Sequence, residues 1–231
     1  MIQGPADRPR FFGRRRGKSL KKRAQELMET LLPRLAVPVP GQGETIDPFS
    51  LFEPAPQGVW LEVGFGGGEH LAAQAVTHPR IGFIGCEPFR NGVASLLGHV
   101  DEAGLQTVRV FYEDARLLLP ALPEASIGRA FILFPDPWPK LRHAERRFVC
   151  AANLDLLARA LADHAELRVA SDDPVYAAWA AKELGHHHLF EEMLTTRDRS
   201  LLPADWVPTR YEQKCLAKRP PTFFLYRRKA R

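Results

Sequence analysis

The sequence is poor in the features that mark export, membrane insertion or disulfide bonding. Its 231 residues include three cysteines, Cys86, Cys150 and Cys215, which lie too far apart for a disulfide framework or a paired-cysteine zinc module. No apolar run approaches the roughly 20 residues that cross a bilayer. The arginine triplet at 14–16 leads into LKKRAQELMET instead of an apolar segment, so it is no export signal. We therefore expect a cytoplasmic chain with no membrane contact, no metal and no obligate protein partner, either a monomer or a homodimer.

Positive charge is concentrated in three segments, although the net charge is only +5. Residues 1–34 carry ten Lys and Arg against three Asp and Glu, and residues 214–231 carry seven against none. The short stretch 140–147 carries four against one, and the remainder of the chain is net acidic. This segregation predicts that a polyanion binds across the basic segments and that a cationic ligand lies in the acidic body.

Residues 57–231 alternate apolar runs with helical stretches and form the predicted α/β domain. Strands are expected at 59–64, 81–87, 107–112, 129–134, 166–171 and 222–228, and helices at 66–78, 89–104 and 145–164. Such alternation is typical of a Rossmann-like fold, with a mostly parallel twisted sheet and helices on both faces. Residues 1–56 are predicted to form a flexible basic arm, a helix capped by Ser19 and a Pro/Gly linker.

A glycine-rich turn follows the first expected strand, in the sequence Leu61 to Glu69. Gly64 and Gly66 let the backbone turn sharply and approach a ligand closely. A dinucleotide site has a third glycine where this chain has Glu69, and a carboxylate at that position repels a pyrophosphate. Glu62, just before the turn, adds a second negative charge. The turn therefore favours a cationic ligand without phosphates, and S-adenosylmethionine, with its ammonium and sulfonium groups, fits this description.

Four successive expected strands end in a carboxylate: Glu62, Glu87, Asp114 and Asp136. Because the carboxyl ends of parallel strands share one edge of a sheet, we expect these side chains to line one site. Glu87 stands where an acidic residue accepts hydrogen bonds from both ribose hydroxyls of a nucleoside. Asp114 is expected to accept from the adenine amino group.

The segment Phe134 to Arg147 carries the strongest indication of chemistry. Prolines on both sides of Asp136 stiffen the backbone, so a fixed loop aims its carboxylate. Trp138 offers a flat face on which a base can stack. Four basic side chains follow and are expected to grip phosphates: Lys140, Arg142, Arg146 and Arg147.

With these motifs the chain resembles the bacterial tRNA (guanine-N7-)-methyltransferases over nearly its whole length. The resemblance rests on FFGRRRGK, LEVGFGGGEH, GCEPFRNGV, FPDPWPKLRHAERR and the stretch Thr209 to Glu212. It implies a class I S-adenosylmethionine-dependent methyltransferase in which 57–231 is the methyltransferase domain. It also implies tRNA as substrate and the variable-loop guanosine 46 as target. The chain has Glu145 where the family usually has a basic residue, which weakens one phosphate contact.

The resemblance assigns roles to individual residues. It implies that the methyl donor is bound by Glu62, Gly64, Gly66, Glu87, Asp114 and Asp136. It implies that the substrate is bound by Lys140, Arg142, His143, Arg146, Arg147, Asp172, Thr209, Arg210, Tyr211 and Glu212.

Guanine N7 has an in-plane lone pair and carries no proton, so its attack on a sulfonium methyl needs no general base. The site must align the two atoms and tolerate positive charge that grows on the purine. We expect Asp136 to be the catalytic carboxylate, with Asp172 as a second acceptor. His143 has no proton to carry, which favours an RNA contact or a local hydrogen bond.

Three other functions remain to be distinguished. An adenine amino-group methyltransferase typically has two prolines and an aromatic residue directly after its Asp, Asn or Ser, whereas here Trp138 separates the prolines. An RNA-binding module without catalysis has no need of four strand-end carboxylates. A nicotinamide oxidoreductase is disfavoured by Glu69. We also expect the basic arm to lie outside the carboxylate cluster.

Overall fold

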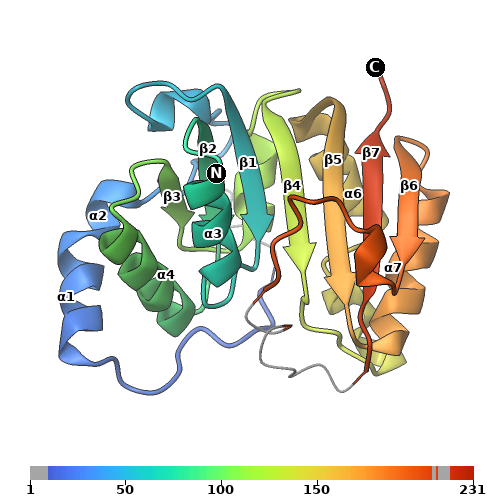
Figure 1. The fold of residues 1–231 in the computed structure, drawn as a ribbon, viewed down its shortest axis with the longest axis horizontal. Helices are drawn as coiled ribbons and strands as arrows, with labels where there is room; N and C mark the ends of the chain where they lie inside the picture. The colour runs from blue at the N-terminus through green and yellow to red at the C-terminus, as the bar shows by residue number, and fades with distance from the viewer. Residues whose placement is uncertain (1–9, 210–211, 213–218) are drawn as a thin grey trace, which may run out of the picture.

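The computed structural model of the chain describes residues 10–209, 212 and 219–231. Its centre is one seven-stranded sheet with the order β3-β2-β1-β4-β5-β7-β6 (Figure 1). The strands are β1 (Gly58–Val63), β2 (Ile81–Cys86), β3 (Val108–Phe111), β4 (Ile127–Leu133), β5 (Leu161–Ser171), β6 (Phe190–Thr196) and β7 (Thr222–Arg228). Only β7 runs antiparallel to its neighbours in this sheet. The predicted mostly parallel α/β sheet is confirmed.

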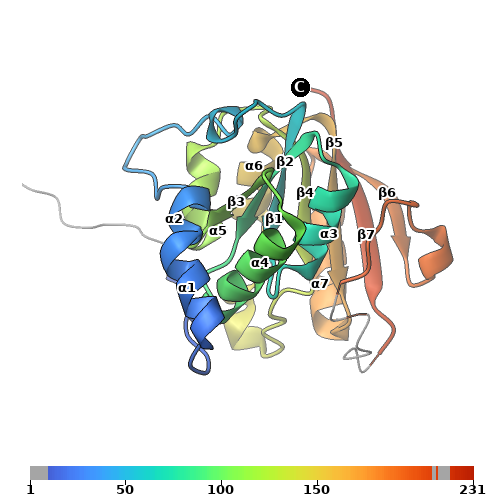
Figure 2. The same ribbon diagram turned by 60° about the vertical axis from the view of Figure 1, so that its left-hand side comes forward.

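Helices cover both faces of the sheet (Figures 1 and 2). One face packs against α1 (Lys22–Thr30), α2 (Leu32–Leu35), α3 (Glu69–Thr77) and α4 (Arg90–Ala103). The other face packs against α5 (Ala115–Leu118), α6 (Ala151–Ala160) and α7 (Pro174–His186). Short 3₁₀ helices complete the described elements: η1 (Phe49–Leu51), η2 (Leu119–Ala121), η3 (Leu141–Arg146) and η4 (Arg199–Leu201). None of the helices in these ranges is long and apolar enough to span a membrane.

A loop, not a helix, covers the first face beside β4 and β5. Trp206 is buried there against Phe131 and Phe223. The Asp205 carboxylate accepts from Arg129 at 2.5 Å and from Arg168 at 2.8 Å, which ties the loop to two central strands. Thr209 follows three residues after Trp206, so this anchoring controls the path of the chain into the predicted substrate segment.

Several features differ from the sequence-based prediction. Helix α1 has Lys21 as its N-cap residue and no side-chain cap, so the prediction that Ser19 caps it is wrong. Helix α7 was not predicted. Helix α6 ends at Ala160, and Leu161, which was expected on a helical face, begins β5 by pairing with Ile127 of β4. Sheet pairing overrides the helical spacing of apolar residues at this point. Strand β6 was missed because its sequence, FEEMLTT, is largely exposed at the sheet edge and has no clean apolar alternation.

Candidate active site

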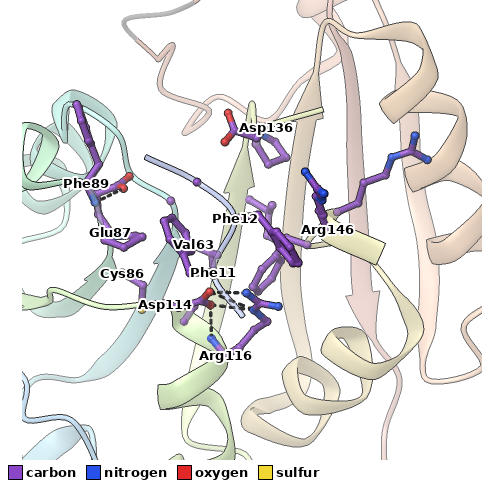
Figure 3. Close-up of a pocket in the computed structure, with 18 of the residues that line it drawn as sticks. Phe11, Phe12, Val63, Cys86, Glu87, Phe89, Asp114, Arg116, Asp136 and Arg146 are labelled. Atoms are coloured by element: carbon purple, nitrogen blue, oxygen red, sulfur yellow. Dashed lines mark hydrogen bonds and ion pairs between the residues drawn. The ribbon is translucent and has the colours of Figure 1, made fainter. Parts of the chain in front are cut away.

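A cleft of about 520 Å³ opens at the carboxyl ends of the parallel strands (Figure 3). It brings together Glu87, Asp114 and Asp136, which follow β2, β3 and β4. Its walls also include apolar side chains and the glycine turn after β1. A second hollow of about 270 Å³ adjoins it along Gly64 and Gly66 and is lined by Glu62 and Thr209. The sheet edge that we predicted to carry the chemistry is therefore concave, and carboxylates and arginines line it together.

The glycine turn forms the wall between these two hollows. Gly64 and Gly66 have φ angles of 72° and 57°, and no atom lies within 4 Å of a Cβ built on either. Behind the turn, a Cβ on Gly92 of α4 would lie 2.2 Å from the Gly66 carbonyl oxygen. Helix α4 therefore packs directly on the turn and fixes it, while the cleft side stays open for a ligand.

Glu87 is a buried carboxylate that braces the turn. Its Oε2 accepts from the Gly66 N–H at 2.8 Å, and its Oε1 accepts from the Phe89 N–H at 2.9 Å (Figure 3). Burial raises the pKa of Glu87 to about 7, an effect that the two backbone hydrogen bonds oppose and the negative charges of Asp136 and Glu62 reinforce. Each oxygen retains acceptor capacity toward the cleft.

Glu62 belongs to a buried relay that sequence reasoning missed. Its Oε2 lies 2.8 Å from Nδ1 of His70, and both side chains are buried. The Gln74 amide nitrogen lies 3.4 Å from Nε2 of His70 and 3.2 Å from the Asp205 carbonyl oxygen, to which it donates. Because the amide donates to both, Nε2 of His70 is an acceptor and Nδ1–H donates to Glu62. The relay thus links the turn to the loop that leads to Thr209.

Asp114 has a partner that the sequence did not indicate. Its carboxylate caps α5 by accepting from the Arg116 N–H at 3.0 Å, and it pairs with the Arg116 guanidinium at 2.6 Å (Figure 3). Arg116 also donates to the Arg10 carbonyl oxygen at 3.0 Å. Asp114 is therefore oriented by a cation, and the same cation ties the basic arm to the cleft.

The basic arm enters the cleft, and the expectation that it lies outside the carboxylate cluster is wrong for its described residues. Phe11 and Phe12 line the cleft (Figure 3). The Arg15 carbonyl accepts from the Arg90 N–H at 2.9 Å, and the Arg15 guanidinium donates to both oxygens of Glu113. These contacts with α4 and the end of β3 explain why residues 10–18 follow the sheet edge. Residues 1–9 of the arm lie outside the described part.

The loop that carries Asp136 has unusual backbone geometry. Asp136 itself is exposed, while Phe134 and Trp138 on either side of its two prolines have φ angles of 50° and 42°. The Arg146 guanidinium lies 5.0 Å from the Trp138 ring centroid and 4.5 Å from that of Phe12. An aromatic and cationic surface therefore stands directly beside the exposed carboxylate.

The remaining predicted substrate residues are distributed unevenly around the cleft. Lys140 and Arg142 are exposed on the basic segment, and the His143 ring contacts Trp138 edge-on. Asp172 directly follows β5. The Glu212 carboxylate accepts from the Thr209 N–H at 2.8 Å. Arg210 and Tyr211 lie outside the described residues.

Arg147 requires a correction. It was expected to grip RNA, but its side chain is buried, with 3% of its surface exposed. Its guanidinium donates to the carbonyl oxygens of Pro137 and Trp138 and packs on the Trp179 ring. A side chain committed in this way cannot also reach a phosphate. A run of basic residues in the sequence does not show which side chains along η3 and at Arg147 are exposed and which are buried.

The chain is similar in sequence to known enzymes. A family model described as "Putative methyltransferase" matches residues 56–225. A tRNA (guanine-N(7)-)-methyltransferase of Paramagnetospirillum magneticum is 63% identical over 227 residues, covering 98% of this chain and 95% of the relative. The enzyme of the same name from Rhodospirillum rubrum is 48% identical over 238 residues, covering 100% of this chain and 92% of the relative.

Solved structures share the fold at low sequence identity. An rRNA methylase from Streptococcus thermophilus matches with a TM-score of 0.51 and 11% identity, over 74% of this chain and 87% of its own. The 16S rRNA methyltransferase KamB matches with a TM-score of 0.55 and 14% identity, over 75% and 89%. These likenesses confirm the predicted Rossmann-like fold. From the family model and its close relatives, the chain belongs to the tRNA (guanine-N7-)-methyltransferase family.

Proposed function

We propose that the chain transfers the methyl group of S-adenosylmethionine to N7 of a guanosine in tRNA, with the variable-loop guanosine 46 as target. The observation that carries the proposal is the convergence of Glu87, Asp114 and Asp136 on one cleft beside an exposed basic segment. Family membership supports the same reaction.

The cleft suits S-adenosylmethionine in size and charge. Its volume of about 520 Å³ lies in the range of small-molecule sites. Glu87 accepts from the ribose hydroxyls, Asp114 accepts from the adenine amino group, and Glu62 faces the cationic end of the ligand. On the open side of Gly64 and Gly66 the ligand can lie close to the protein backbone. When bound, the donor supplies a sulfonium methyl group, an electrophile that a neutral base nitrogen can attack.

The protein's part in methyl transfer is orientation and charge stabilisation. Trp138 holds the guanine by stacking, and Asp136 stabilises the positive charge that the purine gains as N7 is alkylated. We assign Asp172, Thr209 and Glu212 to contacts with the substrate, and Thr209 lines the second hollow beside the glycine turn. Because N7 carries no proton, none of these groups has to remove one. Backbone phosphates are bound by the exposed side chains of Lys140 and Arg142, by the part-buried Arg146, and by Arg210 and Tyr211.

The setting of the reaction follows from the substrate. We place the chain in the cytoplasm, acting on tRNA without a membrane or an obligate protein partner, as a monomer or a homodimer. The division into residues 1–56 and a methyltransferase domain 57–231 stays a prediction, and the contacts of residues 10–18 with α4 support a close association of the two parts.

Product mapping tests the proposed function. The protein is incubated with methyl-labelled S-adenosylmethionine and unmodified tRNA transcripts, and the modified nucleotide is then located. We expect N7-methylguanosine in the variable loop, and no product in a transcript in which that guanosine is replaced by adenosine. N6-methyladenosine as the product, or donor binding without methyl transfer to any transcript, would contradict the proposal.

A further inference from the structure

Among the described residues, only the backbone of its own loop fixes the position of the Asp136 carboxylate. It is exposed, and among the described residues no side chain or backbone group donates a hydrogen bond to it. The loop itself is strained, because Phe134 and Trp138 hold φ angles of 50° and 42°, a region that residues with a Cβ adopt rarely. Such a conformation persists only where the surroundings hold it in place.

Arg147 restrains the loop in this conformation. Its Nε donates to the Pro137 carbonyl oxygen at 3.2 Å, and its Nη2 donates to the Trp138 carbonyl oxygen at 2.9 Å. These are the two carbonyls that directly follow Asp136. The guanidinium carbon lies 4.8 Å from the Trp179 ring centroid, and Trp179 is itself anchored by donation from Nε1 to the Val149 carbonyl oxygen at 2.6 Å.

The neighbouring residue behaves differently. The Arg146 guanidinium faces the cleft over Phe12 and Trp138, and its Nε lies 3.6 Å from a Glu145 carboxylate oxygen, beyond hydrogen-bond distance. Both arginines are among the residues that line the cleft, but Arg147 is the one that donates to the loop carbonyls. A buried guanidinium that donates hydrogen bonds to two backbone carbonyls restrains the backbone that carries them.

We infer that Arg147 is a positioning residue for the methyl transfer: it holds Asp136 and Trp138 in their reacting orientation through the two loop carbonyls, and it does not bind RNA. The inference rests on the proposed function. Lysine is a poor substitute, because one ammonium cannot bridge both carbonyls in a plane and has no flat face for Trp179. Misplacing a reacting group by about 1 Å is enough to lower a rate by about 100-fold.

The test compares Arg147→Gln with two arginine variants of different expected behaviour. Arg159→Gln is the matched structural control, because Arg159 also donates to two consecutive carbonyls, those of Leu119 and Pro120, outside the residues that line the cleft. Arg142→Gln is the control for an exposed phosphate contact. Each protein is assayed for single-turnover methyl transfer at saturating donor and tRNA, for tRNA affinity across a salt series, and for thermal unfolding.

We expect Arg147→Gln to lose about 10- to 100-fold in single-turnover rate while tRNA affinity and its salt dependence stay those of the wild type. Arg159→Gln should lose stability and keep its rate, and Arg142→Gln should lower the salt slope by about one unit. Arg147→Lys, which keeps the charge, should recover only part of the rate and serves as the test should Arg147→Gln not fold.

Three results would overturn the inference. A wild-type rate in both Arg147 variants would show that the restraint is not needed. A salt slope lowered by about one unit in Arg147→Gln would make this residue a phosphate contact. Equal rate losses in Arg147→Gln and Arg159→Gln would reduce the effect to general instability. A wild-type protein that forms no N7-methylguanosine in the same assay would contradict the proposed function instead.

Discussion

At the scale of single residues, Glu87 stands out because a pKa of about 7 leaves its carboxyl group about half protonated at neutral pH. Burial raises its pKa from 4.5 to about 7. The protonated form is thus favoured by folding, so the stability that this group contributes is present in acid and is lost as the pH rises through 7. A cationic ligand in the cleft reverses this preference, because it stabilises the ionised carboxylate.

Donor affinity should therefore depend on pH through Glu87. In the wild type, affinity for S-adenosylmethionine should rise as the pH increases from about 6 to about 8, as the carboxylate ionises and accepts from the ribose hydroxyls. In Glu87→Gln the rise should be absent, and at pH 8 affinity should be lower by about 1.5–3 kcal/mol, the cost of losing hydrogen bonds to a charged acceptor. Isothermal titration across this range measures both. Parallel pH profiles in the two proteins would remove Glu87 from the donor site.

At the scale of elements, the basic arm connects the cleft with the exposed surface around it. Phe11, Phe12 and Arg14 line the cleft, while Arg16 and Lys18 are exposed and form no ion pair among the described residues. The arm follows the carboxyl edge of the sheet in Figure 1. We therefore expect its aromatic and its basic side chains to serve different ligands.

Separate substitutions should divide these two roles. Replacing Phe11 and Phe12 together by alanine should weaken donor binding and slow single-turnover methylation, with little change in the salt dependence of tRNA binding. Replacing Arg16 and Lys18 by glutamine should leave donor affinity unchanged and lower the salt slope by about two units, because each neutralised phosphate releases counterions. Deleting residues 1–18 should combine both effects. Identical tRNA salt slopes in the wild type and the deletion variant would mean that the arm never touches the RNA.

Sequence reasoning succeeded where position along a strand decides the geometry. Glu87, Asp114 and Asp136 could be brought to one edge because each follows a parallel strand, and such ends share one side of a sheet. It failed where contacts between segments that are distant in the sequence determine the position of a side chain. The docking of Phe12 beside Arg146 and the burial of Arg147 depend on tertiary packing, which a run of like charges does not reveal.

At the scale of the whole molecule, the acidic strand ends and the basic segments meet at one cleft. Three carboxylates, those of Glu87, Asp114 and Asp136, line it together with arginines from the arm and the basic segment, and exposed basic side chains beside it suit a polyanion. The strained loop from Phe134 to Trp138 lies where the two meet. We propose that Asp136, at this junction, promotes methyl transfer to guanine N7 in an intact tRNA.

Single-turnover methylation by wild type and Asp136→Asn tests this claim most directly. Both proteins are saturated with labelled S-adenosylmethionine and an unmodified tRNA transcript, and N7-methylguanosine is quantified against time. We expect near-normal tRNA binding by Asp136→Asn and a rate lower by about 100-fold or more, because the amide cannot stabilise the positive charge that develops on the base. A wild-type single-turnover rate in Asp136→Asn would show that this carboxylate does not promote the transfer.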